Sequence, residues 1–360
     1  MTCKTKHLRT IAYRGRMRRA AAVSCAFLMV FSLTACSNSA GSDSSGSAVN
    51  DAQNSTSDKG ASGTGTQSAG NSGQSADDLS SSPREKGSRD NTPICLVPVA
   101  SGDVVYENPY ARLDASNISE GYVVVTYTGD SNKVKLQITG PNEITYTYNL
   151  STDEELEEVF PLQSGNGSYM INVFENIEGT QYSQAFSQQV DVVLSDEFLP
   201  FLYPNQYVSF DSSRQAVAKG EELAYVCNND LEVVSEVYNY IIGHIVYDYE
   251  EAETVQSGYI PDVDEVLSTG KGICLDYAAL MTSMLRSQRI PTRMEIGYAG
   301  TAYHAWLSTY IEDIGWVNGM IEFDGTDWSL MDPTFASNTS DDTLKDFIGD
   351  GSNYSVKYVY

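Results

Sequence analysis

The spacing of apolar residues changes once along the chain, near residue 199, and this change most constrains the fold. Before it, apolar side chains alternate with polar ones, as in Val134–Ile138 and Ile144–Leu150. Period-two alternation is typical of strands with one buried face, and Gly140-Pro141 is a turn signal between these two runs. After residue 199 the apolar spacing becomes helical. The chain therefore combines an all-β part with a part that contains helices.

The all-β part is expected to span residues 93–198. Alternation recurs in Tyr169–Val173 and in Val190–Leu194, with glycine-rich turns between the runs. About seven short strands in roughly 100 residues predict an antiparallel sandwich of immunoglobulin-like kind. No group of residues in it has the spacing of a catalytic site, so the expected role of this domain is spacing or binding.

The part from 199 to 360 reads as an α+β domain, with helices first and an antiparallel sheet afterwards. Asp230 is a candidate cap for a helix over residues 231–247, and a second helix is expected to start near Cys274. Strands are expected after the second helix, and the alternating tyrosines at the end predict a last one. The expected strands are Arg293–Tyr298, Tyr303–Tyr310, Met320–Phe323 and residues 354–360.

Residues 1–36 have the pattern of a secretory leader. Seven basic residues and no acidic one precede Ala20–Leu33, an apolar run shorter than the roughly 20 residues of a spanning helix. The following Leu33-Thr34-Ala35-Cys36 resembles the lipobox of bacterial lipoproteins. That resemblance implies cleavage before Cys36 and a lipid on its sulfur. The expected location is the outer face of the bacterial cell membrane, with the protein anchored by lipid rather than spanning.

Residues 37–92 are expected to form a disordered tether. They are rich in Ser, Gly, Asn, Asp and Ala, and Val49 and Leu79 are their only large apolar side chains. Such a composition cannot offset the entropy of ordering the chain. The net charge of the full sequence is −26, and loss of the seven leader cations would take it to −33. This balance excludes a nucleic-acid binder and favours neutral or cationic partners.

Cys274 is the residue best suited to be a nucleophile. It follows a turn and opens a predicted helix, where unpaired N–H groups and the helix dipole favour a thiolate. His304 lies 30 residues further on in a predicted strand, and Asp332 a further 28 residues on. A thiol, an imidazole and a carboxylate in this order can form a triad. The imidazole would take the thiol proton and the carboxylate would orient the ring.

Several segments together resemble the core of the transglutaminase-like superfamily over roughly residues 230–336. They are Gly272-Ile273-Cys274-Leu275-Asp276-Tyr277-Ala278, Ile290-Pro291-Thr292-Arg293, His304-Ala305-Trp306 and Met331-Asp332-Pro333. The resemblance implies a papain-like fold and a thioester formed from amide substrates. It also implies Cys274 as nucleophile, His304 as base and Asp332 as orienting acid. Asp324 and Asp327 are alternatives for the third role.

The donors of an oxyanion hole are less well defined. The backbone N–H of Cys274 is one natural donor. Animal transglutaminases use a tryptophan well before the nucleophile, and no tryptophan precedes Trp306 in this sequence. Tyr247 is the candidate that would supply an O–H instead; the alternative is that it only packs. No cofactor or metal site is expected, since three histidines and no H-E-x-x-H motif make a His-based centre improbable.

Two functions remain open. One is a lipid-anchored cysteine enzyme that acts on protein or peptide substrates, passing the acyl group to water or to an amine. The other is a catalytically silent binding or assembly module in which the β-domain makes the contacts. The sequence also leaves open whether Cys95 and Cys227 form a disulfide or stay as free thiols. It does not predict an oligomeric state.

Overall fold

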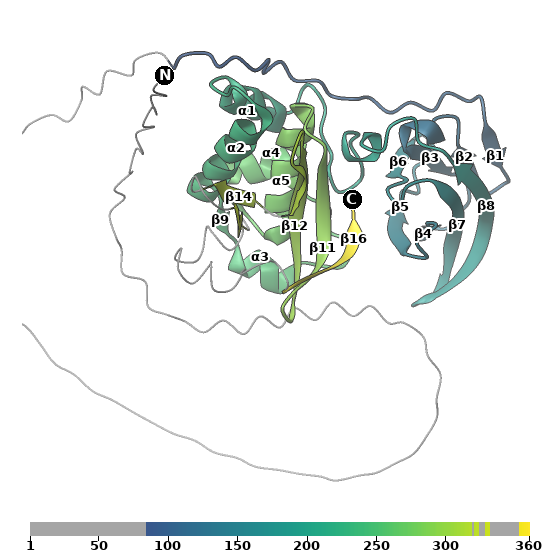
Figure 1. Ribbon diagram of the computed structural model, residues 1–360. Coiled ribbons are helices and arrows are strands. Elements are labelled where there is room, and N and C mark those ends of the chain that lie inside the picture. The colour runs from purple at the N-terminus through teal and green to yellow at the C-terminus, as the bar shows by residue number, and fades with distance from the viewer. Residues whose placement is uncertain (1–83, 319, 324–327, 332–352) are drawn as a thin grey trace, which may run out of the picture.

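The computed structural model describes residues 84–318, 320–323, 328–331 and 353–360 (Figure 1). Two four-stranded sheets form the N-terminal part of the described chain. Helices and a further four-stranded sheet form the C-terminal part, which Figure 1 shows beside them.

The two N-terminal sheets are antiparallel throughout, in the orders β1-β2-β3-β6 and β5-β4-β7-β8. The predicted alternation is visible in β4, where Val134, Leu136 and Ile138 are buried and the residues between them are partly exposed. The described part thus has eight strands here, where the sequence predicted about seven. The strands are β1 (Val105–Glu107), β2 (Ala111–Asp114), β3 (Tyr122–Tyr127), β4 (Val134–Thr139), β5 (Thr145–Leu150), β6 (Glu158–Pro161), β7 (Gly167–Glu178) and β8 (Gln181–Val192).

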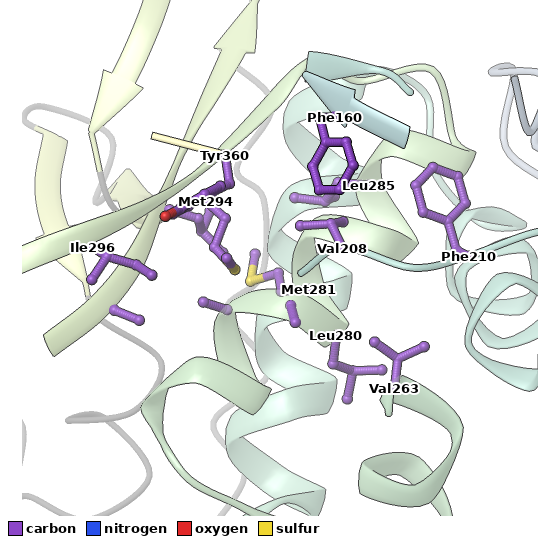
Figure 2. Close-up of a cluster of buried hydrophobic side chains, with 14 of the residues drawn as sticks. Phe160, Val208, Phe210, Val263, Leu280, Met281, Leu285, Met294, Ile296 and Tyr360 are labelled. Carbon is purple, nitrogen blue, oxygen red and sulfur yellow. The ribbon is translucent and has the colours of Figure 1, made fainter. Parts of the chain in front are cut away.

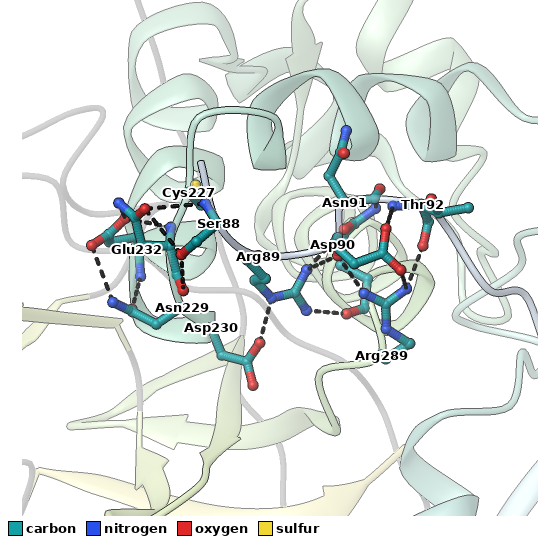
Figure 3. Close-up of polar contacts among 12 residues, drawn as sticks. Ser88, Arg89, Asp90, Asn91, Thr92, Cys227, Asn229, Asp230, Glu232 and Arg289 are labelled. Carbon is teal, nitrogen blue, oxygen red and sulfur yellow. Dashed lines mark hydrogen bonds and ion pairs between the residues drawn. The ribbon is translucent and has the colours of Figure 1, made fainter. Parts of the chain in front are cut away.

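Residues 84–95, here called the N-terminal strap, correct the predicted end of the tether at residue 92. The amide of Gly87 donates to Tyr225 O at 2.8 Å and that of Ile94 donates to Ser287 O at 2.8 Å. Arg89 forms an ion pair with Asp230 at 2.6 Å (Figure 3). Residues 84–92 are therefore bonded to the helical part. The composition misled because their partners lie more than 130 residues away.

Five α-helices follow two short 3-10 turns in the described chain. The predicted helix over residues 231–247 is shorter than expected, since α2 ends at His244 and Tyr247 lies in a strand. Its N-cap is Asn229, whose side chain accepts from Glu232 N, rather than Asp230. The elements are η1 (Ile118–Glu120), η2 (Leu199–Phe201), α1 (Gln215–Ala224), α2 (Asp230–His244), α3 (Tyr249–Thr254), α4 (Val263–Thr269) and α5 (Cys274–Ser287).

The C-terminal sheet has the order β13-β12-β11-β16 and is antiparallel. The predicted strands after the second helix are confirmed, including the last one, which pairs with β11. Helix α5 packs on β11 and β12. The strands of this part are β9 (Val246–Tyr247), β10 (Lys271–Gly272), β11 (Thr292–Ala299), β12 (Ala302–Ile311), β13 (Gly315–Asn318), β14 (Met320–Phe323), β15 (Trp328–Met331) and β16 (Tyr354–Val359).

One buried apolar cluster continues from the N-terminal sheets into the helices. Figure 2 shows a section of it, with Phe160 of β6, Leu285 of α5 and Met294 of β11. Burying such side chains together supplies the main driving force for folding. Helix α5 is buried along almost its whole length, so its two ends are held by the surrounding structure.

The described helices include none with the length and apolarity needed to cross a bilayer.

Candidate active site

Cys274 is the first residue of α5, as the sequence predicted. Helix α4 ends at Thr269, and its C-cap residue, Gly270, has the left-handed backbone conformation that glycine favours. The next two residues form β10, which pairs in parallel with β9. Ile273 is extended and caps the helix, and Cys274 is 8% exposed. The thiol therefore lies at a rigid, nearly buried helix N-terminus, where the helix dipole favours a negative charge.

Tyr247 lies in the neighbourhood of Cys274. The register of β9 and β10 puts it directly opposite Gly272, two residues before the thiol. Burial raises the pKa of the Tyr247 phenol above its ordinary value, and the charge of Cys274 raises it further. This phenol therefore keeps its proton at any physiological pH and can donate a hydrogen bond.

His304 lies on β12, opposite Gly297 of β11, and is 6% exposed. Because residues two apart on a strand share a face, His304 groups with Trp306 and Tyr303 groups with Ala305. The rings of His304 and Trp306 are stacked, with centroids 6.2 Å apart and planes at 22°.

Cys274 lies close enough to two tyrosines for its charge to act on their pKa values. Burial is the main cause of the raised pKa of Tyr303, neighbouring tyrosines add to it, and the charge of Cys274 adds less than they do. At Tyr247 the charge of Cys274 is the largest cause after burial.

The remaining predicted site residues lie outside the described residues. These are Asp332, its alternatives Asp324 and Asp327, and the lipidation candidate Cys36.

The structure adds one residue that the sequence reasoning missed, the buried carboxylate of Asp276. Its Oδ2 accepts from the amide of Ile273 at 2.8 Å, and its Oδ1 accepts from the hydroxyl of Tyr259 at 2.8 Å. The side chain is 0% exposed, and burial raises its pKa to about 6. An acidic residue at the third helical position, reaching back to the cap residue, is half of a capping box. That signal was present in the sequence.

A cavity of about 410 Å³ opens next to Asp276, with α3, α4 and β10 around it. Six carboxylates and a single lysine are among its lining residues, so its field is strongly negative. These residues are Asp248, Glu250, Glu251, Asp262, Glu265, Asp276 and Lys271. Several of the carboxylates cap helices; Asp262, for example, accepts from Asp264 N at 3.1 Å. No group of side chains suited to hold a metal ion occurs in the described ranges.

The other cysteines of the described chain settle one open question. Cys95 and Cys227 are free thiols, so the predicted alternative of a disulfide between them is wrong. Burial raises the pKa of both thiols, that of Cys227 to about 11. Neither is suited to nucleophilic attack at neutral pH.

Residues 218–319 match the family described as the transglutaminase-like superfamily, so the chain contains a domain of that superfamily. The domain includes Cys274, His304 and Tyr247, and has mixed α/β content with antiparallel sheets. No curated protein matches the chain.

Solved structures resemble the chain only distantly. A candidate cysteine protease from Cytophaga hutchinsonii has a TM-score of 0.31 at 18% identity, over 64% of this chain and 79% of that one. A candidate protease from Parabacteroides distasonis has a TM-score of 0.26 at 15% identity, over 50% and 36%. Red sea bream transglutaminase has a TM-score of 0.23 at 13% identity, over 59% and 48%.

Proposed function

We propose that this protein is a cysteine enzyme that attacks amide bonds of peptides or proteins through Cys274. The observation that carries the proposal is the position of this thiol. It is nearly buried at the N-terminus of a 14-residue helix inside a transglutaminase-like domain, in the neighbourhood of a phenol that stays protonated. Such a site favours both a thiolate and the oxyanion that forms when the thiolate attacks a carbonyl.

In the proposed reaction, His304 accepts the thiol proton and the Cys274 thiolate forms a C–S bond to the carbonyl carbon. The carbonyl π electrons move to oxygen, where the N–H of Cys274 and the O–H of Tyr247 stabilise the negative charge. The C–N bond then breaks, and the imidazolium returns the proton to the departing amine. Water or a second amine attacks the thioester, takes the acyl group and restores the thiol. Asp332 is the proposed orienting acid for His304.

The acidic cavity beside Asp276 supports a substrate or acceptor that carries an amine, such as a lysine-containing peptide. We also propose that the N-terminal sheets form an immunoglobulin-like sandwich. The leader sequence supports a lipid on Cys36 and a position on the outer face of the cell membrane.

The test is the rate of iodoacetamide alkylation at Cys274 as a function of pH, measured on the full chain and on the His304→Ala variant. Mass spectrometry of the separate cysteine peptides makes Cys95 and Cys227 internal references for unactivated thiols. We expect the alkylation rate of Cys274 to reach its plateau at a pH well below about 8.5, the ordinary pKa of a cysteine thiol. We expect this plateau at low pH to be absent from the His304→Ala variant.

An ordinary thiol titration at Cys274, or an identical profile in the His304→Ala variant, contradicts the proposal. If the plateau is present, incubation with lysine-containing peptides separates the two acceptors. Hydrolysis releases free carboxyl products, and acyl transfer releases ammonia or an amine together with a new amide.

A further inference from the structure

The turn that presents Cys274 lacks the usual side-chain cap. The N-cap residue is Ile273, which has no polar atom to bond the exposed amides of the first helical turn. Its own amide instead donates to Asp276 Oδ2, one turn further along the helix. The backbone conformation just before the thiol is therefore set by the carboxylate of Asp276.

Both oxygens of this carboxylate are used. While Oδ2 accepts from Ile273, Oδ1 accepts from the hydroxyl of Tyr259, which lies in the connection between α3 and α4. The carboxylate is 0% exposed, so these two donors take the place of water. Tyr259 is thus the residue that fixes the carboxylate, and the carboxylate fixes the turn.

The backbone also packs closely around this carboxylate. A Cβ atom at Gly272 would lie 2.7 Å from Asp276 Cβ, closer than real Cβ contacts allow. Other charged groups near the carboxylate are Glu251 of α3 and Glu265 of α4, and both raise its pKa. The strand before the thiol therefore lies directly against the Asp276 side chain, and a side chain at position 272 would displace it.

An ordinary cap would not require an acid at this position. Asn caps helices as well as Asp does, because one side-chain oxygen is enough. At Asp276, however, two donors face two different oxygens, and a carboxylate accepts from both without rearrangement. An asparagine would turn its NH₂ group either toward the Ile273 amide, which cannot accept, or toward the Tyr259 hydroxyl, which would then have to accept instead of donate.

We propose that Asp276 and Tyr259 are positioning residues of the site: the Tyr259 hydroxyl holds the Asp276 carboxylate, and the carboxylate holds the turn that aims the Cys274 thiol and amide. This inference rests on the proposed role of Cys274 as nucleophile. Through Tyr259, the connection between α3 and α4 is linked to the turn that precedes Cys274.

The test compares Tyr259→Phe and Asp276→Asn with the unchanged chain by two measurements. Amide hydrogen exchange at Ile273 reports the bond to the carboxylate, whether or not Cys274 is activated. The plateau rate of iodoacetamide alkylation reports the aim of the thiol. We expect faster exchange in both variants, and a plateau rate that falls about tenfold in Asp276→Asn and about threefold in Tyr259→Phe, since bonds to charged groups are lost.

The matched control is Asp211→Asn, at a position before α1 and outside the cavity beside Asp276. Asp211 also accepts from two donors, but both bond its Oδ1, the Ser213 amide at 2.7 Å and the Ser213 hydroxyl at 2.5 Å. Asparagine can reproduce that arrangement, so this variant should leave both measurements unchanged.

Faster exchange with an unchanged alkylation rate overturns the proposal, because it reduces the pair to a purely structural role. Unchanged exchange in Tyr259→Phe overturns it as well, and this variant decides the question if Asp276→Asn does not fold. An unchanged chain whose Cys274 titrates as an ordinary thiol contradicts the proposed function instead. The exchange measurement and the maximal alkylation rate at high pH still test the positioning pair in that case.

Discussion

The two ends of helix α5 are each held by one buried charged side chain, and the two side chains do different work. At the N-terminus, Asp276 bonds Ile273 and Tyr259, which are 3 and 17 residues away in sequence. At the C-terminus, the guanidinium of Arg286 donates to main-chain oxygens of Thr292, Tyr203 and Tyr360, at distances of 2.7–2.9 Å.

Both charges have the sign that the helix dipole favours, and both are penalised by burial. Burial raises the pKa of Asp276 to about 6 and lowers that of Arg286 to about 9. The difference lies in reach, because the partners of Arg286 are 6, 83 and 74 residues away. We infer that Asp276 positions the proposed nucleophile through bonds to residues nearby in sequence. Arg286 stabilises the fold through bonds to residues far along the chain.

The largest effect is expected at the C-terminal end. Replacing Arg286 by Leu removes three hydrogen bonds made by a buried charged group, so we expect it to lower the free energy of unfolding by roughly 3–5 kcal/mol. Urea denaturation measures this change. The control is Arg112→Leu on β2, where the guanidinium is one-third exposed and its ion pairs are 3.7 and 3.9 Å long. A loss of about 0.5 kcal/mol is expected there. Equal losses of stability in the two variants would contradict a special role of Arg286 in stabilising the fold.

The N-terminal end of α5 should make the stability of the protein depend on pH, because Asp276 titrates there. Because the folded pKa of Asp276 is raised to about 6, the folded protein retains a proton between about pH 4 and pH 6 that the unfolded chain has lost. Stability from this group is fully present below pH 4 and is lost as the pH rises through 6, by roughly 3 kcal/mol. The stability difference between the unchanged chain and Asp276→Asn should fall accordingly from pH 4 to pH 7. Parallel curves over this range would contradict the assignment.

The strap adds a further constraint at the C-terminal end of α5. Arg89 pairs with Asp230 (Figure 3). It also donates to the main-chain oxygen of Gln288, which follows the helix. Arg89→Ala should cost about 2 kcal/mol, as expected for hydrogen bonds to a charged group that is only 10% exposed. The more exposed pair of Lys219 with Glu222 is the reference, and Lys219→Ala should cost less than about 0.5 kcal/mol. If the strap contributes little to stability, both Arg89→Ala and Lys219→Ala should lower the free energy of unfolding by less than about 0.5 kcal/mol.

The smallest effects compare two glycines. Gly272→Ala would crowd Asp276, and we expect a loss of about 1–2 kcal/mol. Gly243 lies within α2 with open space where a Cβ would stand, so Gly243→Ala should raise stability by about 0.5–1 kcal/mol. Thermal unfolding of both variants distinguishes these signs. A gain at both positions would show that the reactive turn is not tightly packed.

The sequence predicted those parts of the fold whose signals are local. Alternation located β4, β5, β7 and the last residues of β8, which ends at Val192 before the predicted Leu194, and the turn before Cys274 located the start of α5. Helices α1, α3 and α4 were missed. Helix α1 follows Arg214, which makes no side-chain cap, so it has no start signal. Helices α3 and α4 are short, although Asp248 and Asp262 before their acidic first turns are capping signals.

What the sequence could not predict depends on partners far along the chain. The strap is polar and reads as tether, yet it is ordered by amides that bond Tyr225, Cys227 and Ser287. For the site, the sequence predicted Cys274 with Tyr247 nearby, and the transglutaminase-like domain is confirmed. The roles of Cys274, His304, Asp332 and Tyr247 stay predictions. The double use of Asp276 was hidden because Tyr259 reaches it from a loop without regular spacing.

The route of the strap has a mechanical consequence. Its bonds to Tyr225, Cys227 and Ser287 lie between the start of the described chain and strand β1. A pulling force applied before residue 84 would therefore load these bonds first and reach the N-terminal sheets only after they rupture. The helical domain would take up the tension, and the two N-terminal sheets would stay unloaded.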